Sequence, residues 1–279
     1  MSHWIGHGVV TMHSAAAEPP LPLLPFGHVA HERLGMPYPA PPGSLSPSAP
    51  PAGGVPEQVA YTRDASIYDS RTSTFDTYRR QLVDLLPLRP GDVVLDVGCG
   101  TGLCFEQVRD RIGAEGAIVG VDASREMLEV AAARVAARGW RNVLLVQSAV
   151  EQAELPAVDH VLFCATHDVL QSDAALDNVL AHVRDGGTVA ATGGKWAPPW
   201  AIALNAGILA LHAPYVRNFT GFDRPWNRLE SRLERLRVRE VAMGGGYLAS
   251  GTVPSRIVPL GAGPLDRESD DAGPRQARR

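Results

Sequence analysis

The chain has 279 residues, of which 45% are hydrophobic and 20% charged, and its formal net charge is −4 at pH 7. This length allows one large domain or two small ones, and the composition is that of a globular chain. The mild negative charge gives no general attraction to polyanions, which argues against nucleic acid as a partner. The three cysteines suggest neither a disulfide framework nor a zinc-type cluster. We therefore expect reduced thiols, no metal and a cytoplasmic protein.

Residues 1–56 differ in composition from the rest of the chain. Twelve of the 23 prolines fall between Pro19 and Pro56, interspersed with Ser, Ala and Gly. Such a segment cannot offset its ordering entropy by burial, so we predict a disordered tail, and a second one at 261–279. The start of the chain lacks the basic region and continuous apolar core of a signal peptide. The apolar run 198–216 is short and contains polar residues, so we expect no stable membrane insertion.

The segment between the tails, 57–255, is predicted to form one domain. A helical pattern over 57–88 precedes a regular alternation of strands and helices. Strands are expected at 93–97, 117–122, 143–147, 158–164 and 188–192. Helices are expected at 103–112, at 124–138 with Ser124 as the N-cap, and from Ser172 or Asp173 onward, with a turn at 185–187. Such alternation predicts parallel strands covered on both faces by helices.

The pattern changes after the fifth strand. The run 198–216 is interpreted as a helix, and Leu229, Leu233 and Leu236 as the apolar side of another. Strands at 238–243 and 247–253 flank three glycines, which predicts a hairpin. The expected fold class is therefore α/β, with a doubly wound, mostly parallel seven-stranded sheet that ends in an antiparallel hairpin.

A glycine-rich turn follows the first strand directly. Residues 93–102 read Val-Val-Leu-Asp-Val-Gly-Cys-Gly-Thr-Gly, and the second strand ends in Asp122 about twenty residues later. The glycines have G-x-G-x-G spacing. The dinucleotide fingerprint requires G-x-G-x-x-G, and position 103 is leucine. Glycines here allow close approach of a ligand, and the following helix offers free backbone N–H groups.

This segment resembles motif I of the class I S-adenosylmethionine (SAM) dependent methyltransferases, whose fold is Rossmann-like. The resemblance implies that Asp96 handles the ammonium end of the methionine and that Asp122 accepts hydrogen bonds from the ribose hydroxyls. Cys99 is most simply a small residue in a tight turn. The cofactor-binding residues that we expect are Asp96, Gly98, Cys99, Gly100, Gly102, Asp122, Ala123, Met127, Ala149, Val150 and Tyr68.

Some of these assignments leave alternatives open. In the family an acid after the third strand often meets the adenine amino group, but Ala149 stands at that position. The adenine contact then comes from backbone groups near Ala149 and Val150 or from Glu151, or it is missing. Met127 lies near the adenine or packs in the core. Tyr68 closes over the methionine portion or packs in the core.

We expect the residues that contact the methyl acceptor to follow the fourth strand. His167 and Asp168 come shortly after the end of this strand. Ligands bind at the carboxyl edge of such sheets, so both residues are candidate catalytic residues. His167 acts either as a general base or only shapes the pocket. Aromatic residues in the insertion 196–228 line an apolar substrate pocket or form an ordinary core. They are Trp196, Trp200, Tyr215, Phe219, Phe222 and Trp226. The arginines and glutamates of 228–240 are interpreted as intrahelical pairs.

The resemblance predicts methyl transfer from SAM to an oxygen, nitrogen or carbon atom of a small molecule. The apolar insertion favours an apolar or lipid-like acceptor. Two alternatives remain: a methyltransferase-like SAM-binding protein without activity, which the departure at Ala149 keeps open, and an NAD-dependent oxidoreductase. Leu103 and the absence of a Tyr-x-x-x-Lys pair argue against the oxidoreductase. The sequence does not indicate an oligomeric state.

Overall fold

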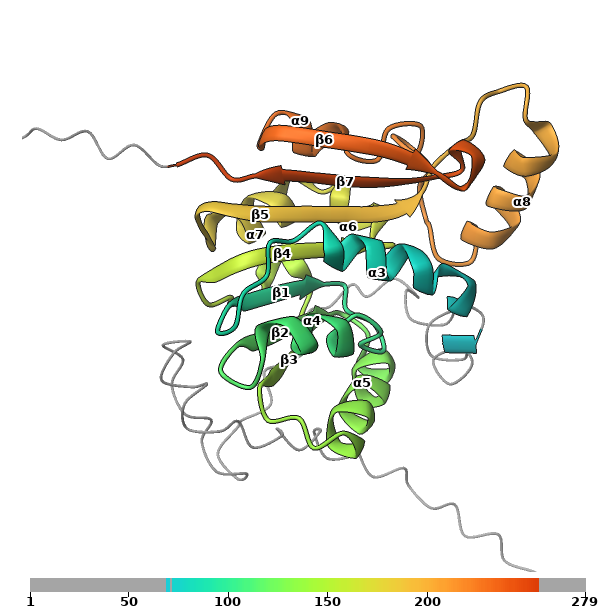
Figure 1. The fold of residues 1–279 in the computed structure, drawn as a ribbon. Helices are drawn as coiled ribbons and strands as arrows, with labels where there is room; N and C mark the ends of the chain where they lie inside the picture. The colour runs from blue at the N-terminus through green and yellow to red at the C-terminus, as the bar shows by residue number, and fades with distance from the viewer. Residues whose placement is uncertain (1–68, 71, 256–279) are drawn as a thin grey trace, which may run out of the picture.

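The computed structural model describes residues 69–70 and 72–255 of the chain. Within these residues, seven strands form one sheet in the order β3-β2-β1-β4-β5-β7-β6 (Figure 1). The strands are β1 (Val93–Val97), β2 (Ala117–Asp122), β3 (Val143–Gln147), β4 (Val158–Cys164), β5 (Val183–Gly194), β6 (Glu234–Val241) and β7 (Gly246–Thr252). Strands β1 to β5 are parallel, and β7 lies antiparallel between β5 and β6. The predicted fold class is confirmed.

Helices cover both faces of the sheet. The elements are η1 (Ser73–Phe75), α3 (Asp76–Asp84), α4 (Phe105–Ile112), α5 (Arg125–Ala137), η2 (Val150–Gln152), α6 (His167–Leu170), α7 (Asp173–Ala181), α8 (Ile202–His212), α9 (Asn227–Glu230) and η3 (Ala242–Gly244). Apolar residues of α3, α4 and α5 pack on one face, and those of α6, α7 and α9 on the other. Strand β1 is buried on both sides, with Val94 facing the first group and Leu95 the second.

Short side chains begin the two helices that the sequence predicted best. The Ser124 hydroxyl accepts the backbone N–H of Met127 at 3.3 Å, which caps α5. The Ser172 hydroxyl accepts the backbone N–H of Ala175 at 3.2 Å and caps α7. The cap of α5 matters for function because it fixes the chain directly after Asp122.

The predicted turn at 185–187 was wrong, and the strand predicted at 188–192 is part of a longer one. A single strand, β5, runs through both, and it contains an irregularity where four residues of β5 lie opposite one residue of β4. Val158 pairs with Val183, but His160 pairs with Thr188. Gly186, at a φ of 72°, lies in this irregularity. The sequence shows the glycines, but it does not show that the chain continues in the same strand after them.

The helix predicted from Leu229, Leu233 and Leu236 was also too long. Helix α9 ends at Glu230, and Leu236 lies in β6. The predicted intrahelical arginine pairs change accordingly. Arg232 lies 3.0 Å from carboxylates of both Asp173 and Asp177 in α7, and Arg228 also pairs with Asp173. These exposed pairs join neighbouring elements, and water screens them, so they contribute little to stability.

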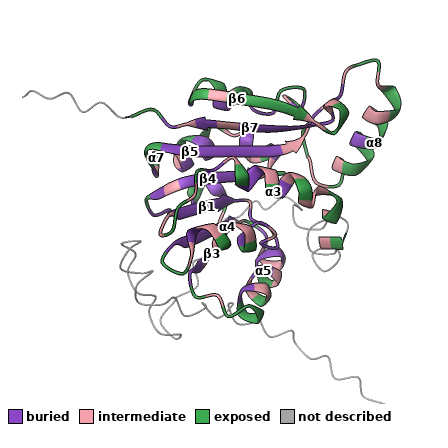
Figure 2. Cartoon of the chain, viewed as in Figure 1, coloured by how far each residue is buried: buried purple, intermediate pink, exposed green. Residues whose placement is uncertain are grey.

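The insertion between β5 and β6 forms its own small cluster. Trp196 stacks on Phe219 with a centroid distance of 5.2 Å, and Phe219 meets Phe222 edge-on at 4.9 Å. Trp226 instead packs on Tyr247 of β7. These rings form core, whereas Trp200 is 82% exposed beside α8, whose surface is largely exposed (Figure 2). Among the described residues, no helix has both the length and the apolar character needed to cross a bilayer.

The domain boundaries stay predictions. The predicted tails at 1–56 and 261–279 lie outside the described residues, as do residues 57–68, including Tyr68, of the helical segment predicted at 57–88. From this segment, α3 is seen to bury Leu82 and Val83 against the sheet.

Candidate active site

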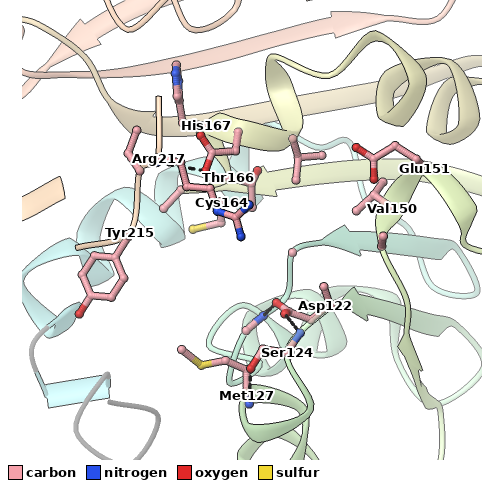
Figure 3. Close-up of a pocket in the computed structure, with 18 residues that line it drawn as sticks. Asp122, Ser124, Met127, Val150, Glu151, Cys164, Thr166, His167, Tyr215 and Arg217 are labelled. Carbon is pink, nitrogen blue, oxygen red and sulfur yellow. Dashed lines mark hydrogen bonds between the residues drawn. The ribbon is translucent and has the colours of Figure 1, made fainter. Parts of the chain in front are cut away.

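A pocket of about 640 Å³ opens at the carboxyl ends of β1, β2, β3 and β4 (Figure 3). Nine of the predicted site residues line it, namely Gly98, Gly100, Asp122, Ala123, Met127, Ala149, Val150, His167 and Asp168. One side comes from the loops after β1, β2 and β3, and the facing side from residues 164–169 and 215–217. A pocket between these loops is the expected ligand position in an open parallel sheet.

The glycine turn after β1 has a conformation that requires glycine at three positions. Gly98, Gly100 and Gly102 have φ values of 62°, 54° and 76°. A Cβ on Gly98 would overlap the Thr166 methyl group, and one on Gly102 would lie 2.5 Å from the Phe105 ring. Gly98 and Gly100 line the pocket, whereas Gly102 makes room for the start of α4.

Asp122 holds this turn in place. One carboxylate oxygen accepts the backbone N–H of Gly100 at 2.8 Å, and the other accepts that of Ser124 at 2.8 Å. Burial raises the pKa of Asp122, and these backbone donors oppose the rise. Each oxygen keeps a second lone pair for a hydroxyl donor in the pocket. The geometry therefore suits a ribose diol beside a preformed loop.

Asp96 lies in a side cavity of about 40 Å³ that shares Gly98, Gly100, Cys164 and Ala165 with the main pocket. It is 1% exposed, and among the described residues neither carboxylate oxygen has a hydrogen-bond partner. Burial raises the pKa of Asp96 well above its usual range. A buried acceptor without a donor is costly, so this position fits an ammonium group, directly or through water.

The structure adds a clamp on the glycine turn that the sequence did not reveal. The Thr101 hydroxyl donates to Asp69 at 2.6 Å, and Arg134 of α5 pairs with the same carboxylate. Arg134 also donates to the Thr101 carbonyl at 2.9 Å. The three residues are far apart in sequence, so only the fold places them together. Asp69 directly follows Tyr68, which lies outside the described residues.

The adenine end of the predicted site has no acid at Ala149. Ala149 and Val150 line the pocket where β3 passes into η2, and Glu151 beside them accepts the Ser172 hydroxyl at 2.8 Å. Met127 is 2% exposed and lies at the pocket wall. Both of its anticipated roles, core packing and proximity to a ligand, are compatible with this position.

The His167 side chain is held by the insertion. Its Nε2 lies 3.1 Å from the carbonyl oxygen of Thr220, and its ring meets Phe222 edge-on at 5.0 Å. A carbonyl only accepts, so Nε2 carries the proton and the lone pair lies on Nδ1. Nδ1 is buried without a partner among the described residues, and burial lowers the pKa of His167. As folded, neither ring nitrogen is placed to take a proton from a pocket ligand.

Three further residues line the pocket, of which the sequence had indicated only Tyr215 as a possible lining residue. Arg217 and Tyr215, both after α8, line the pocket opposite Asp122. The Arg217 backbone N–H donates to the exposed Asp168 carboxylate at 3.5 Å. Cys164 ends β4, and hydrogen bonding from the Cys104 thiol, helped by Arg79, lowers its pKa. The sequence carried no signal for Arg217.

The strand order, the glycine turn after β1 and the acid after β2 define the Rossmann-like fold of methyltransferases. Residues 94–187 match a family model described as a methyltransferase domain. Aklanonic acid methyltransferase from Streptomyces sp. strain C5 is 32% identical over 112 residues, which cover 40% of this chain and 51% of that protein. Nocamycin O-methyltransferase from Saccharothrix syringae is 39% identical over 86 residues, 30% of this chain and 31% of that protein.

A solved structure agrees with the fold. Haemonchus contortus phosphoethanolamine N-methyltransferase 2, in complex with SAM, matches with a TM-score of 0.53 at 12% identity, covering 70% of this chain and 60% of that one. Residues 94–187 therefore carry a SAM-dependent methyltransferase domain of the class I type, whose methyl donor is SAM. The chain spans about a third to a half of the length of the two curated relatives.

Proposed function

We propose that this protein transfers the methyl group of SAM to an oxygen, nitrogen or carbon atom of a small molecule. The observation that carries the proposal is the Asp122 carboxylate, which fixes the glycine turn and lines a pocket. Beside it lies Asp96, a buried acid that has no hydrogen-bond partner among the described residues. The names of the aklanonic acid and nocamycin methyltransferases support a small-molecule acceptor. A cytoplasmic location and the absence of a nucleic-acid partner stay predictions.

Different pocket residues would contact different parts of SAM. Asp96 would face the methionine ammonium, and the glycine turn with the N-terminus of α4 would face its carboxylate. Asp122 would accept from the ribose, and the backbone at Ala149 and Val150 would border the adenine. When bound, SAM supplies a methyl group on a positively charged sulfur.

The opposite side of the pocket, formed by residues 164–169 and 215–217, would bind the methyl acceptor. His167 and Asp168 stay candidate catalytic residues, and the contact with Thr220 favours positioning of the insertion by His167 over proton transfer. Many methyl transfers need little more than alignment of the acceptor atom with the methyl carbon, because proximity itself lowers the barrier. The buried imidazole and the rigid turn both serve such alignment.

Calorimetry with S-adenosylhomocysteine tests the cofactor site. We expect binding by the unaltered protein, a loss of about 10- to 100-fold in Asp122→Asn, and little change in Asp110→Asn, an exposed acid on α4. Binding of NADH without S-adenosylhomocysteine would contradict the proposal. Binding of S-adenosylhomocysteine without transfer of labelled methyl to any small molecule would indicate a binding protein without activity.

A further inference from the structure

Hydrogen bonds from side chains hold the glycine turn after β1 at two places. Asp122 accepts the backbone N–H of Gly100, which holds the side of the turn that borders the proposed ribose position. Thr101 lies between Gly100 and Gly102, whose φ values of 54° and 76° are in the left-handed region that favours glycine. Because glycines on both sides give the chain unusual conformational freedom, Thr101 needs a contact of its own to keep one position.

Asp69 and Arg134 supply that contact in a closed ring of hydrogen bonds. The Thr101 hydroxyl donates to Oδ1 of Asp69 at 2.6 Å, and Arg134 pairs with Oδ2 of the same carboxylate. Nε of Arg134 donates to the Thr101 carbonyl oxygen at 2.9 Å, which closes the ring. The planar guanidinium makes both of its contacts at once, which a lysine could not do in the same geometry. The ring therefore fixes the side chain and the backbone of Thr101, which is itself buried.

The ring acts on the part of the turn that faces the proposed methionine position. Thr101 lines the side cavity of about 40 Å³ that also contains Asp96. Neither Asp69 nor Arg134 is among the described residues that line this cavity or the main pocket, so both act through Thr101. The proposed adenine position at Ala149 borders the main pocket and not the side cavity, so it is remote from the ring.

We propose that Asp69 and Arg134 are positioning residues for the methionine end of SAM. This inference rests on the proposed function, in which the turn and Asp96 bind that end of the cofactor. By holding Thr101, the ring keeps the turn in its binding conformation before SAM arrives, so that less ordering is needed on binding. Removal of any one member opens the ring and frees the Thr101 end of the turn.

Two probes that differ in the methionine chain separate this role from a general loss of structure. S-adenosylhomocysteine carries the ammonium and carboxylate groups, whereas 5′-methylthioadenosine keeps the adenine, the ribose and the sulfur without them. In calorimetry, Asp69→Asn and Arg134→Gln should each raise the Kd of S-adenosylhomocysteine about 10-fold, the equivalent of one hydrogen bond to a charged group. The Kd of 5′-methylthioadenosine should change less than about threefold. Equal increases for both probes would show that the ring supports the whole pocket, and would overturn the proposal.

The closed ring also predicts that its members act together. The Asp69→Asn and Arg134→Gln double variant should raise the Kd of S-adenosylhomocysteine about 10-fold, like each single variant, whereas independent contributions would give about 100-fold. Thr101→Val removes the hydroxyl with little change in volume and should match the single variants. Thr101→Ser keeps the hydroxyl and should bind within about threefold of the unaltered protein. A 100-fold loss in the double variant, or equal losses for valine and serine, would contradict the ring.

Arg138→Gln is the matched control. Arg138 lies at the end of the same helix, α5, and pairs with the exposed Glu106 instead of with the turn. Its replacement should change the Kd of S-adenosylhomocysteine less than about threefold. If Asp69→Asn and Arg134→Gln also bind as tightly as the unaltered protein, the positioning role is refuted and the proposed function stays intact. If the unaltered protein does not bind S-adenosylhomocysteine, the proposed function fails as well.

Discussion

The glycine turn permits a quantitative test, because two of its glycines differ in what surrounds them. Gly98 and Gly100 both have positive φ, but a Cβ on Gly100 meets nothing within 4 Å, whereas one on Gly98 overlaps the Thr166 methyl group. Alanine at Gly100 should lower the free energy of unfolding by about 1–2 kcal/mol, the cost of the left-handed backbone. Alanine at Gly98 adds about 1–3 kcal/mol of overpacking, which gives about 2–5 kcal/mol.

Serine at Thr166 isolates the overlap, because it removes the methyl group and keeps the hydroxyl. The assay is urea denaturation of the four proteins of a Gly98→Ala and Thr166→Ser cycle, with Gly100→Ala beside them. We expect the double variant to recover about 1–3 kcal/mol relative to the sum of the single variants. A coupling within about 0.5 kcal/mol of zero, or equal losses for the two alanine variants, would refute the reasoning.

Three further predictions address charge and capping. Asp96→Asn should stabilise the ligand-free protein at pH 7 by about 1–3 kcal/mol, since it removes a buried charge, yet weaken S-adenosylhomocysteine binding; denaturation and calorimetry measure the two effects. Burial lowers the pKa of His160, His167 and His212 below the usual 6.5. As the pH falls, these imidazoles therefore take up protons in the unfolded chain before they do so in the folded protein. The free energy of unfolding should therefore fall from pH 7 to 5, and less steeply in His212→Asn; equal slopes in denaturation would contradict this. Ser124→Ala should lower the free energy of unfolding by about 1 kcal/mol through the lost cap of α5, measured by urea denaturation.

The cofactor half of the site could be predicted from sequence because it is local. The strand, the turn and the second acid lie within 30 residues, and Asp122 meets Gly100 because β1 and β2 are neighbouring parallel strands. Strand β5 was misjudged because glycines mark a turn and a strand irregularity alike. Helix α9 was drawn too long because leucines spaced for a helix continue into β6.

The acceptor half could not be predicted in the same way. Arg217 reaches the pocket only because the insertion folds back over α6, and the contact between His167 and Thr220 joins residues 53 positions apart. No periodic pattern in the sequence predicts contacts between residues so far apart in the chain. Of the aromatic residues, Trp196, Phe219 and Phe222 form a cluster behind His167. Trp226 packs on Tyr247, Trp200 is exposed, and Tyr215 alone of the six lines the described pocket.

The buried Asp96 carboxylate lowers the stability of the ligand-free protein but favours binding of an ammonium group. Folding places Asp96 away from water with no donor among the described residues, and the raised pKa of Asp96 expresses this penalty. Because the folded pKa lies above the unfolded one, the penalty grows as pH rises through the usual range of an aspartate. A bound ammonium group would remove it, so part of the binding energy is relief of a strain built into the ligand-free protein. Replacing Asp96 should therefore separate stability from affinity, whereas replacing Asp122 should lower both, because Asp122 also holds the turn.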